Sequence, residues 1–291
     1  MKLMRRWAWM MACVAATAST AACGGDDSSE KGSVREALAR SDGLKVGHVA
    51  LYNQKTELRS VHGGSSNFYG GWRPPPNPRC ETTTEGSCTV SRCQRLTSAD
   101  YGPSFELIEA SAGLVEIRRS NSPEVLTLGP GRSGLEAAGS LWSGGEQFTI
   151  KAAGDSDGVP GFETSLKAPS MVKVTAPGQP TAGGWIIPRS RDFELQWTYE
   201  GEPSGVVTIG MGDGRFNLDS VECKVPVQNG GVKIPASALA VLSAGTGYWS
   251  LHLLEEKTIE VEGGWKVTAS LFTEGAGPGA GGLASVPVTF E

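Results

Sequence analysis

The chain has 291 residues, of which 40 are Gly and 17 are Pro, and its formal net charge is −5. Apolar residues make up 39% and charged residues 20%, which excludes both a disordered polyelectrolyte and a polytopic membrane protein. Glycine is present at about twice its usual share, and the lack of a Gly-X-Y period excludes collagen. Such glycine use predicts many tight turns between short strands.

The first 22 residues have the pattern of an export signal. Lys2, Arg5 and Arg6 precede an apolar run over residues 7–22. That run is shorter than the roughly 20 residues that a permanent membrane-spanning helix needs, and no second apolar run of comparable length follows. We therefore expect an exported protein whose mature chain has no transmembrane helix.

The end of this leader resembles the bacterial lipoprotein signal, in which small residues precede a cysteine that is lipidated and becomes the new N-terminus. The matching segment is Ser19-Thr20-Ala21-Ala22-Cys23. Thr20 stands where that signal usually has Leu, so ordinary secretory cleavage after residues 16–18 is the alternative. We expect lipidation at Cys23 and anchoring to a membrane of the cell envelope, with a secreted soluble protein as the other outcome.

A polar tether is expected over residues 23–43. Residues 24–33 carry too little apolar surface to offset the entropy of ordering them, and Val34–Arg40 predicts two marginal helical turns. Removing residues 1–22 deletes three cations and no acids, which changes the net charge from −5 to −8. Such an acidic body argues against nucleic acid as a partner and against electrostatic docking to anionic lipid.

Four cysteines remain beyond the leader, namely Cys80, Cys88, Cys93 and Cys223. An even count outside the cytosol favours disulfides. If residues 88–93 are extended, their ends lie roughly 16 Å apart on opposite faces, too far for a bridge. Cys80 would then bond to Cys88 or Cys93, and the other would reach Cys223 or stay free. The spacing, with no nearby His, does not match a zinc site, so we expect neither metal nor cofactor.

Period-two alternation dominates the rest of the chain and predicts an all-β, mostly antiparallel fold. The clearest run is Phe193–Tyr199, whose alternation makes Trp197 a core residue. A short helix is expected over Pro235–Leu242, and no run supports the helix of a parallel crossover. The other expected strands are Lys45–Leu51, Gly113–Arg118, Val125–Leu128, Gln147–Ala152, Met171–Thr175, Val206–Met211, Val221–Val227, Tyr248–Leu254, Trp265–Leu271 and Ser285–Phe290.

The length of the chain beyond the tether, about 245 residues, and the positions of its Pro-containing segments favour two domains. Ala168-Pro169 and the Pro-rich segment 176–180 divide it into 44–168 and 169–291. Each part carries five or more strands with turn signals every 8–12 residues, which is typical of immunoglobulin-like or fibronectin-like sandwiches in tandem. The Cys-Trp-Cys spacing of antibody domains is missing, so the likeness is architectural.

Several segments together support a resemblance that covers most of the mature chain. They are the leader ending at Cys23, the cluster Cys80 to Cys93 with Gly86-Ser87-Cys88, the turn Gly158–Phe162, the stretch Arg191–Trp197, and Val221-Glu222-Cys223. On these segments, the chain resembles a family of uncharacterised secreted bacterial lipoproteins found in predatory and soil-dwelling bacteria. The resemblance implies an envelope location and a β-rich fold with immunoglobulin-like domains, and it implies no catalytic residues.

Catalytic motifs are missing from the sequence, so we expect no enzyme. The three histidines, His48, His62 and His252, lie outside nucleophile, zinc and acid–base motifs. His252 is expected to be solvated, because it lies on the strand face opposite Trp249 and Leu251. Adjacent acids such as Glu255-Glu256 or Asp155 and Asp157 would serve glycoside hydrolysis only if two carboxyls converged at about 5–9 Å.

Two acidic turns share features with calcium-binding loops. Gly154-Asp155-Ser156-Asp157-Gly158 has alternating acids, but the Glu that closes an EF-hand is missing and Asp-Gly is a common hairpin turn. Met211–Arg215 has the same character. Ordinary turns are the favoured interpretation of both.

Aromatic residues raise the question of a glycan-binding surface. Trp197, Trp249 and Trp265 alternate with other apolar residues on their strands and are expected in the core. Aromatic side chains beside Gly or Pro either form a surface platform for sugars or cap the end of a sandwich core. These residues are Tyr69, Trp72, Trp142 and Trp185.

These observations predict a lipid-anchored envelope protein of structural or protein-interaction type, with contacts through a sheet face or edge. The alternative is a carbohydrate- or cell-wall-binding lipoprotein that uses the four turn aromatics. A glycan-acting hydrolase is the third possibility. The partner is therefore a membrane through the lipid, together with an envelope protein or polysaccharide.

Overall fold

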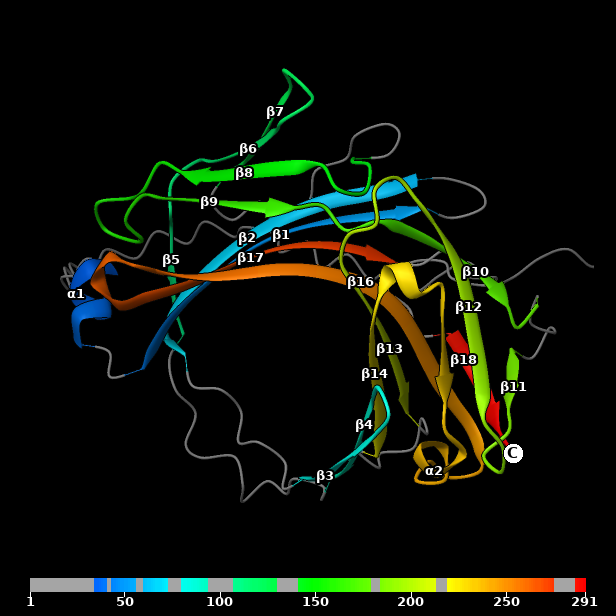
Figure 1. Ribbon diagram of the computed structural model, residues 1–291. Helices are drawn as coiled ribbons and strands as arrows, with labels where there is room; N and C mark the ends of the chain where they lie inside the picture. Colours follow the sequence, from blue (N-terminus) through cyan, green and yellow to red (C-terminus); the bar gives the residue numbers. More distant parts are fainter. Residues whose placement is uncertain are drawn as a thin grey trace, which may run out of the picture. The chain divides into compact units, whose positions relative to one another are not determined.

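The computed structural model describes most of the chain beyond the leader and is dominated by β-strands (Figure 1). The described residues are 34–40, 43–55, 60–72, 80–93, 107–129, 141–178, 184–212, 219–274 and 286–291. They form one sheet of eleven strands, one of four and one of three. The all-β prediction is confirmed. Within these residues, no helix is long and apolar enough to cross a membrane.

The large sheet collects strands from all parts of the sequence. Its main path has the order β3-β4-β14-β13-β16-β17-β1-β2-β5. Off this path, β18 pairs with both β16 and β11. Nearly all pairs are antiparallel; the exceptions are β1 with β17 and β11 with β18. The bounds are β1 (Leu44–Lys55), β2 (Ser60–Trp72), β3 (Cys80–Glu85), β4 (Cys88–Cys93), β5 (Ile108–Ala110), β11 (Trp185–Ile187), β13 (Val206–Gly212), β14 (Ser220–Pro226), β16 (Gly245–Val261), β17 (Trp265–Glu274) and β18 (Val286–Phe290).

One hydrophobic core forms beneath the four-stranded sheet. That sheet has the order β7-β6-β8-β9, with bounds β6 (Val115–Arg119), β7 (Val125–Leu128), β8 (Gln147–Ala152) and β9 (Phe162–Lys167). Alternation on β8 directs Phe148 and Ile150 inward, where both are fully buried. They join Leu51 of β1 and Trp265 of β17 in a single cluster. We name this cluster the N-terminal core.

A second core forms beneath the three-stranded sheet β10-β12-β15, with bounds β10 (Met171–Ala176), β12 (Phe193–Glu200) and β15 (Gly231–Ile234). Trp197 lies in it as predicted, and its indole Nε1 donates a hydrogen bond of 2.9 Å to the carbonyl oxygen of Val227. Trp249 of β16 and Met211 of β13 pack in the same cluster. We name this cluster the C-terminal core.

The 17-residue strand β16 extends from the neighbourhood of α1 to that of α2 (Figure 1), and its side chains contribute to both cores. Its first part pairs with β13 and directs Trp249, Leu251 and Leu253 into the C-terminal core. Its second part pairs with β17, and Ile259 and Val261 pack against the N-terminal core. All five are odd-numbered and therefore lie on one face of the strand, on which Lys257, between the two sets, is exposed.

The domain boundary expected between residues 168 and 169 separates the strands of the four-stranded sheet from those of the three-stranded sheet. It does not separate the residues of the two cores. Strand β17 lies in the range 169–291, yet it packs in the N-terminal core. Conversely, Cys88 and Val90 of β4 lie in the range 44–168 and pack in the C-terminal core. The physical reason is that β16 with β17 and the β3–β4 hairpin each cross from one half of the sequence to the core of the other.

Two short helices flank the sheets. Helix α1 (Val34–Arg40) is the helical segment that the sequence predicts, and it buries Leu38 against β2. A Cβ on Gly70 would meet the Cδ2 methyl of Leu38, so a larger residue there would require the Leu38 side chain to shift. Helix α2 (Ala236–Leu239) covers four residues of the helix predicted over 235–242, and Pro235 precedes it as its N-cap.

The link between β9 and β10 is a buried polar joint. Ser170 is fully buried; its hydroxyl donates to the carbonyl oxygen of Glu202 at 2.8 Å and accepts the backbone N–H of Ser204 at 2.9 Å. The carbonyl of Ser170 accepts a hydrogen bond from the buried Thr273 hydroxyl of β17. This joint therefore connects elements of both cores.

Ser170→Ala should lower the free energy of unfolding by about 1–3 kcal/mol, because the Ser204 N–H and the Glu202 carbonyl lose a buried partner. Urea unfolding followed by tryptophan fluorescence measures the change. Ser165→Ala is the matched control, since Ser165 is exposed on β9. Equal unfolding midpoints for the two variants would contradict the proposed role of the joint.

Candidate functional site

The β3–β4 hairpin is held to the sheet by two disulfides. Its strands are joined by the two-residue turn Gly86-Ser87, in which Gly86 has a φ of 65° that favours glycine. Cys80 is bonded to Cys93 across the hairpin, and Cys88 is bonded to Cys223 of β14. The disulfide prediction is confirmed, with one of the two pairings that the sequence left open.

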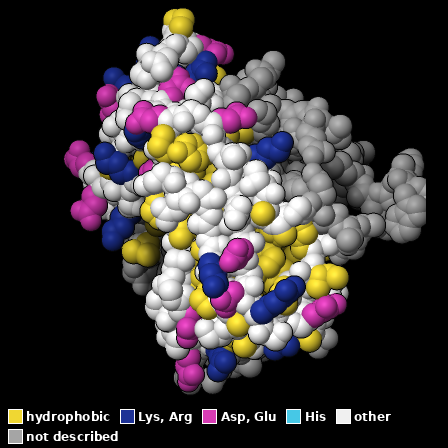
Figure 2. All heavy atoms as spheres, turned by 45° about the vertical axis from the view of Figure 1, so that its right-hand side comes forward, with side chains coloured by type: hydrophobic (Ala, Val, Ile, Leu, Met, Phe, Trp, Pro, Cys, Tyr) yellow, Lys and Arg dark blue, Asp and Glu magenta, His cyan; other side chains and the backbone are white. Residues whose placement is uncertain are grey.

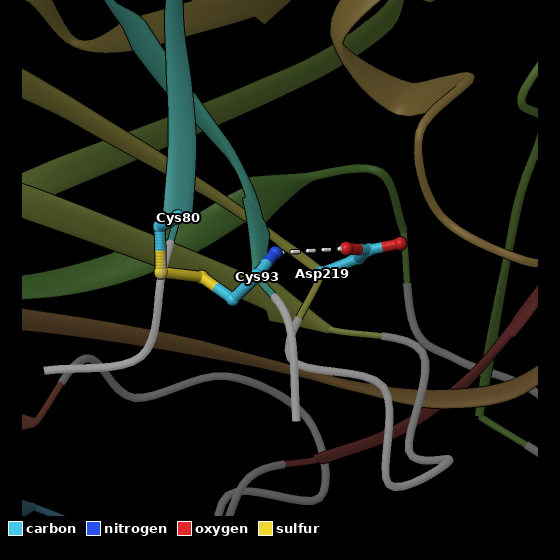
Figure 3. Close-up of a disulfide and its surroundings, with 3 residues drawn as sticks. All are labelled: Cys80, Cys93 and Asp219. Atoms are coloured by element: carbon cyan, nitrogen blue, oxygen red, sulfur yellow. Dashed lines mark hydrogen bonds between the residues drawn. A yellow bond between two sulfur atoms is a disulfide. The ribbon is translucent and has the colours of Figure 1, made fainter. Parts of the chain in front are cut away.

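The two bonds lie in different environments. Cys88 and Cys223 are fully buried in the C-terminal core, and their cross-link spans 135 residues of sequence. In the chain-entropy description, a closure of that length stabilises the fold by about 5 kcal/mol. Cys80–Cys93 closes the outer end of the hairpin, where the backbone N–H of Cys93 donates to Asp219 Oδ1 at 3.3 Å (Figure 3). Both ends of β4 are thereby fixed.

Strand β3 forms an open edge of the large sheet. It pairs with β4 in a regular register from Cys80↔Cys93 to Glu85↔Cys88, and no described strand pairs with its other side. Five of its six residues are exposed and the sixth is half-buried. Three consecutive threonines, Thr82 to Thr84, supply the β-branched side chains that favour an extended backbone.

The free hydrogen-bonding groups of β3 follow from the register. The Cα atoms of Cys80 and Cys93 are 4.0 Å apart, a separation typical of a pair that exchanges no hydrogen bonds. Alternation then directs the backbone N–H and C=O groups of Cys80, Thr82 and Thr84 outward. Glu81, Thr83 and Glu85 form the ladder to β4.

Other edges of the sheets are less accessible to a partner. Strands β5 and β11 have three residues and β7 and β15 have four, while β10 carries a register shift near its end. Strand β9 has six residues, of which three are buried and one is half-buried. Short, bulged or covered edges are the usual protection against strand pairing. Among the outermost strands of the three sheets, within the described residues, β3 combines full length, regularity and exposure.

The predicted aromatic platform is not formed as an exposed surface. Trp142 is 2% exposed, packs edge-on against Phe148 and donates from Nε1 to the carbonyl oxygen of Pro169. Trp185 is 5% exposed and packs against Trp249, with ring centroids 4.4 Å apart. For these two residues the platform prediction is wrong. The alternative that the sequence offered, of aromatics covering core ends, describes them.

The remaining platform residues lie on β2. Tyr69 is half-buried and pairs in register with Val46 of β1 and Glu109 of β5. The side chain of Trp72 is not among those that the structure describes. Cys23, the expected lipidation site, also lies outside the described residues. The predicted core residues Trp249 and Trp265 are each 2% exposed.

His252 lies opposite Trp249 and Leu251 on β16, as predicted, but it is not freely solvated. It is half-buried, and its imidazole stacks on Phe272 of β17 with ring centroids 5.1 Å apart. Burial lowers the pKa of His252 below the usual 6.5, opposed by the carboxylate of Glu222 and aided by Lys224. The loss of hydration on the sheet face thus disfavours the charged imidazole.

A lowered pKa in the folded state means that the unfolded chain binds the proton more readily. Stability contributed by neutral His252 is present above pH 6.5 and is lost as pH falls below that value. His252→Gln should therefore weaken the fall in unfolding free energy between about pH 7 and pH 5. Urea titrations at several pH values test this, with His48→Gln at an exposed position of β1 as control. An unchanged pH dependence in His252→Gln would contradict the assignment.

The acidic turn at residues 154–158 is not part of a metal-holding cluster among the described residues. The Asp155 Oδ1 atom accepts the backbone N–H of Asp157 at 3.0 Å, so this segment is a self-bonded turn. Among the described residues, no group of three or more His, Cys, Asp or Glu side chains could hold a metal ion. Met211–Arg215 is described only as far as residue 212.

The adjacent acids of β16 also fail to converge. Glu255 and Glu256 are consecutive on the strand, so their side chains point to opposite faces of the sheet. Burial raises the pKa of Glu255, partly offset by Lys167. This pair lacks the converging arrangement that the hydrolase hypothesis requires.

Comparisons with known proteins give little further information. No protein-family model matches the chain, and no curated protein matches it. Among solved structures, it is similar to a chain from "Structural insight into host cell surface retention of a 1.5-MDa bacterial ice-binding adhesin". The identity is 12% and the TM-score 0.19, over 85% of this chain and 66% of that chain. At that TM-score the similarity carries no inference about fold or function.

Proposed function

We propose that this chain is a lipid-anchored protein-interaction module of the cell envelope, which accepts an extended segment of a partner protein along the free edge of β3. The observation that carries the proposal is an exposed, regular edge strand held in place by two disulfides. Strand addition uses backbone hydrogen bonds for affinity and alternate side chains for specificity. The role is binding rather than catalysis.

The disulfides make this edge suited to binding. A flexible strand would lose conformational entropy when a partner docks, whereas a fixed strand has already lost it on folding. Cys80–Cys93 fixes one end of the hairpin, and Cys88–Cys223 fixes β4 to the core. Their presence also supports a location outside the reducing cytosol.

Side chains on β3 indicate the chemistry of the partner. Thr82, Thr83 and Thr84 favour β-branched residues on the facing strand, because such cross-strand pairs stabilise sheets. Glu81 is exposed next to them and favours a basic residue opposite it. The expected ligand is an extended protein segment that combines Thr, Val or Ile with Lys or Arg.

Charged side chains of both signs are interspersed among the described residues on the side displayed in Figure 2. Exposed ion pairs such as Lys167–Glu202 and Lys233–Asp192 follow the same mixed pattern. This supports short-range strand pairing over long-range attraction as the basis of recognition.

An immunoglobulin-like character is proposed for the C-terminal part alone. There, the sheet β10-β12-β15 faces β11, β18, β16, β13 and β14 across one core that contains Trp197. Two facing, mainly antiparallel sheets around a buried Trp are typical of such sandwiches, although β11 pairs with β18 in parallel here. The N-terminal core depends on β16 and β17, so a second independent sandwich is not part of the proposal.

Proline at Thr82 tests the edge. Thr82→Pro removes an outward N–H and places a ring on the free side, while the hydrogen bonds of Glu81, Thr83 and Glu85 to β4 remain. A photoreactive residue at position 84 should form a discrete adduct in cells, reduced roughly tenfold by Thr82→Pro, as expected for a loss of about 1.4 kcal/mol. Thr82→Val keeps the N–H and should retain the adduct.

The control position is Thr198, which is exposed on β12, an interior strand of its sheet. A photoreactive residue there should form no adduct of the same mass. Equal adducts with Thr82→Pro and Thr82→Val, or adducts at position 198 as strong as at 84, would refute strand addition at β3. Thiol titration of each variant confirms that both disulfides remain intact.

Anchoring is tested separately. Cys23→Ala removes the only thiol that the lipoprotein signal would modify, so it should transfer the protein from the membrane fraction to the soluble fraction. Cell fractionation followed by immunoblotting measures the distribution. Unchanged partitioning would remove the lipid anchor from the proposal and leave the strand edge unaffected.

A further inference from the structure

A pocket lies at the end of the N-terminal core that is far from β3 in the order of the large sheet. It has a volume of about 580 Å³, within the usual range for small-ligand sites. Its walls come from α1, the start of β1, the β8–β9 loop and the β16–β17 turn. Trp265 and Leu38 contribute to its lining but are almost fully buried, so the accessible surface is mainly polar.

Four charged side chains line this pocket. Arg35 of α1 and Lys45 of β1 are cationic, and Asp155 of the β8–β9 loop and Glu262 of the β16–β17 turn are anionic. In the part of the chain that the structure describes, none of the four forms an ion pair. Lys45 Nζ donates to the carbonyl oxygen of Gly263 at 3.0 Å instead.

The β8–β9 loop forms a stiff wall. Asp155 N–H donates to the Val159 carbonyl at 2.9 Å, and Val159 N–H donates to the Ser111 carbonyl at 2.8 Å. Gly154 has a φ of 89°, and a Cβ there would collide with the backbone of Gly161. The loop is thereby held before any ligand binds, which lowers the entropy cost of binding.

We propose that this pocket binds a small zwitterion, that is, a molecule with an ammonium group and an oxyanion a few atoms apart. Arg35 and Lys45 are the lining groups that would complement an oxyanion, and Asp155 and Glu262 are those that would complement an ammonium. A ligand with a single charge would meet two like charges along with two opposite ones. A zwitterion finds a complement for each of its charges. The proposal is independent of strand addition at β3.

Two sources supply this chemistry, namely an ethanolamine phosphate headgroup and an amino acid or short peptide. Calorimetric titration of the purified full-length protein with O-phosphoethanolamine and with glycylglycine distinguishes them. Either should bind at least tenfold more tightly than ethanolamine, acetate or inorganic phosphate. Hydrogen exchange should slow in residues 153–161 and 262–264 when the ligand binds. Preference for one probe identifies the source.

Charge removal within the pocket provides the decisive comparison. Arg35→Gln and Glu262→Gln should each weaken binding at least tenfold, and both residues are exposed, so the fold should be retained. Arg118→Gln and Glu163→Gln, at exposed positions of β6 and β9 outside the pocket, should leave binding unchanged. The proposal is overturned if neither zwitterion binds, if single-charge probes bind equally well, or if the pocket variants match the controls.

Discussion

The alternation of β16 is the constraint on which both cores depend. Side chains on a strand alternate strictly between two faces, so a slip of one residue exchanges the buried and exposed sets. In β16 such a slip would remove Trp249 and Leu253 from one core and Ile259 and Val261 from the other. Its register is therefore specified twice, by two separate clusters, and its pairing with β13 and β17 is correspondingly well determined.

Several strands with regular alternation are predicted from the sequence, but β9 is not among them, although its residues alternate between buried and exposed. Val125–Leu128 and Gln147–Ala152 are strands with the predicted bounds. Strand β2 was missed because its glycines and serines are typical of turns, whereas here Gly64 lets the chain approach Leu51 of β1 closely. A local pattern does not report such a contact, since it depends on a distant residue. The short strands β5, β11 and β15 carry too few residues to show a period.

The same limit applies to the candidate site. Cysteine count and spacing predicted a disulfide from Cys80 to Cys88 or Cys93, because the geometry of an extended segment is a local property, and left a second bond to Cys223 open. The sequence left open whether Trp142 is exposed or covers a core end, since its hydrogen-bond acceptor Pro169 is 27 residues away. Likewise, the exposure of β3 depends on which strand lacks a neighbour. That is a property of the whole sheet, and Thr82–Thr84 alone do not reveal it.

The position of Cys223 has a consequence for how the chain matures. Synthesis proceeds from the N-terminus, so Cys80, Cys88 and Cys93 all emerge about 130 residues before the native partner of Cys88. During that interval three thiols compete within 14 residues, and only the pairing of the outer two leaves the correct one free. The turn at Gly86-Ser87 places Cys80 opposite Cys93, so formation of the hairpin itself selects the first bond. The Gly86-Ser87 turn thus keeps the Cys88 thiol unpaired until Cys223 has been synthesised.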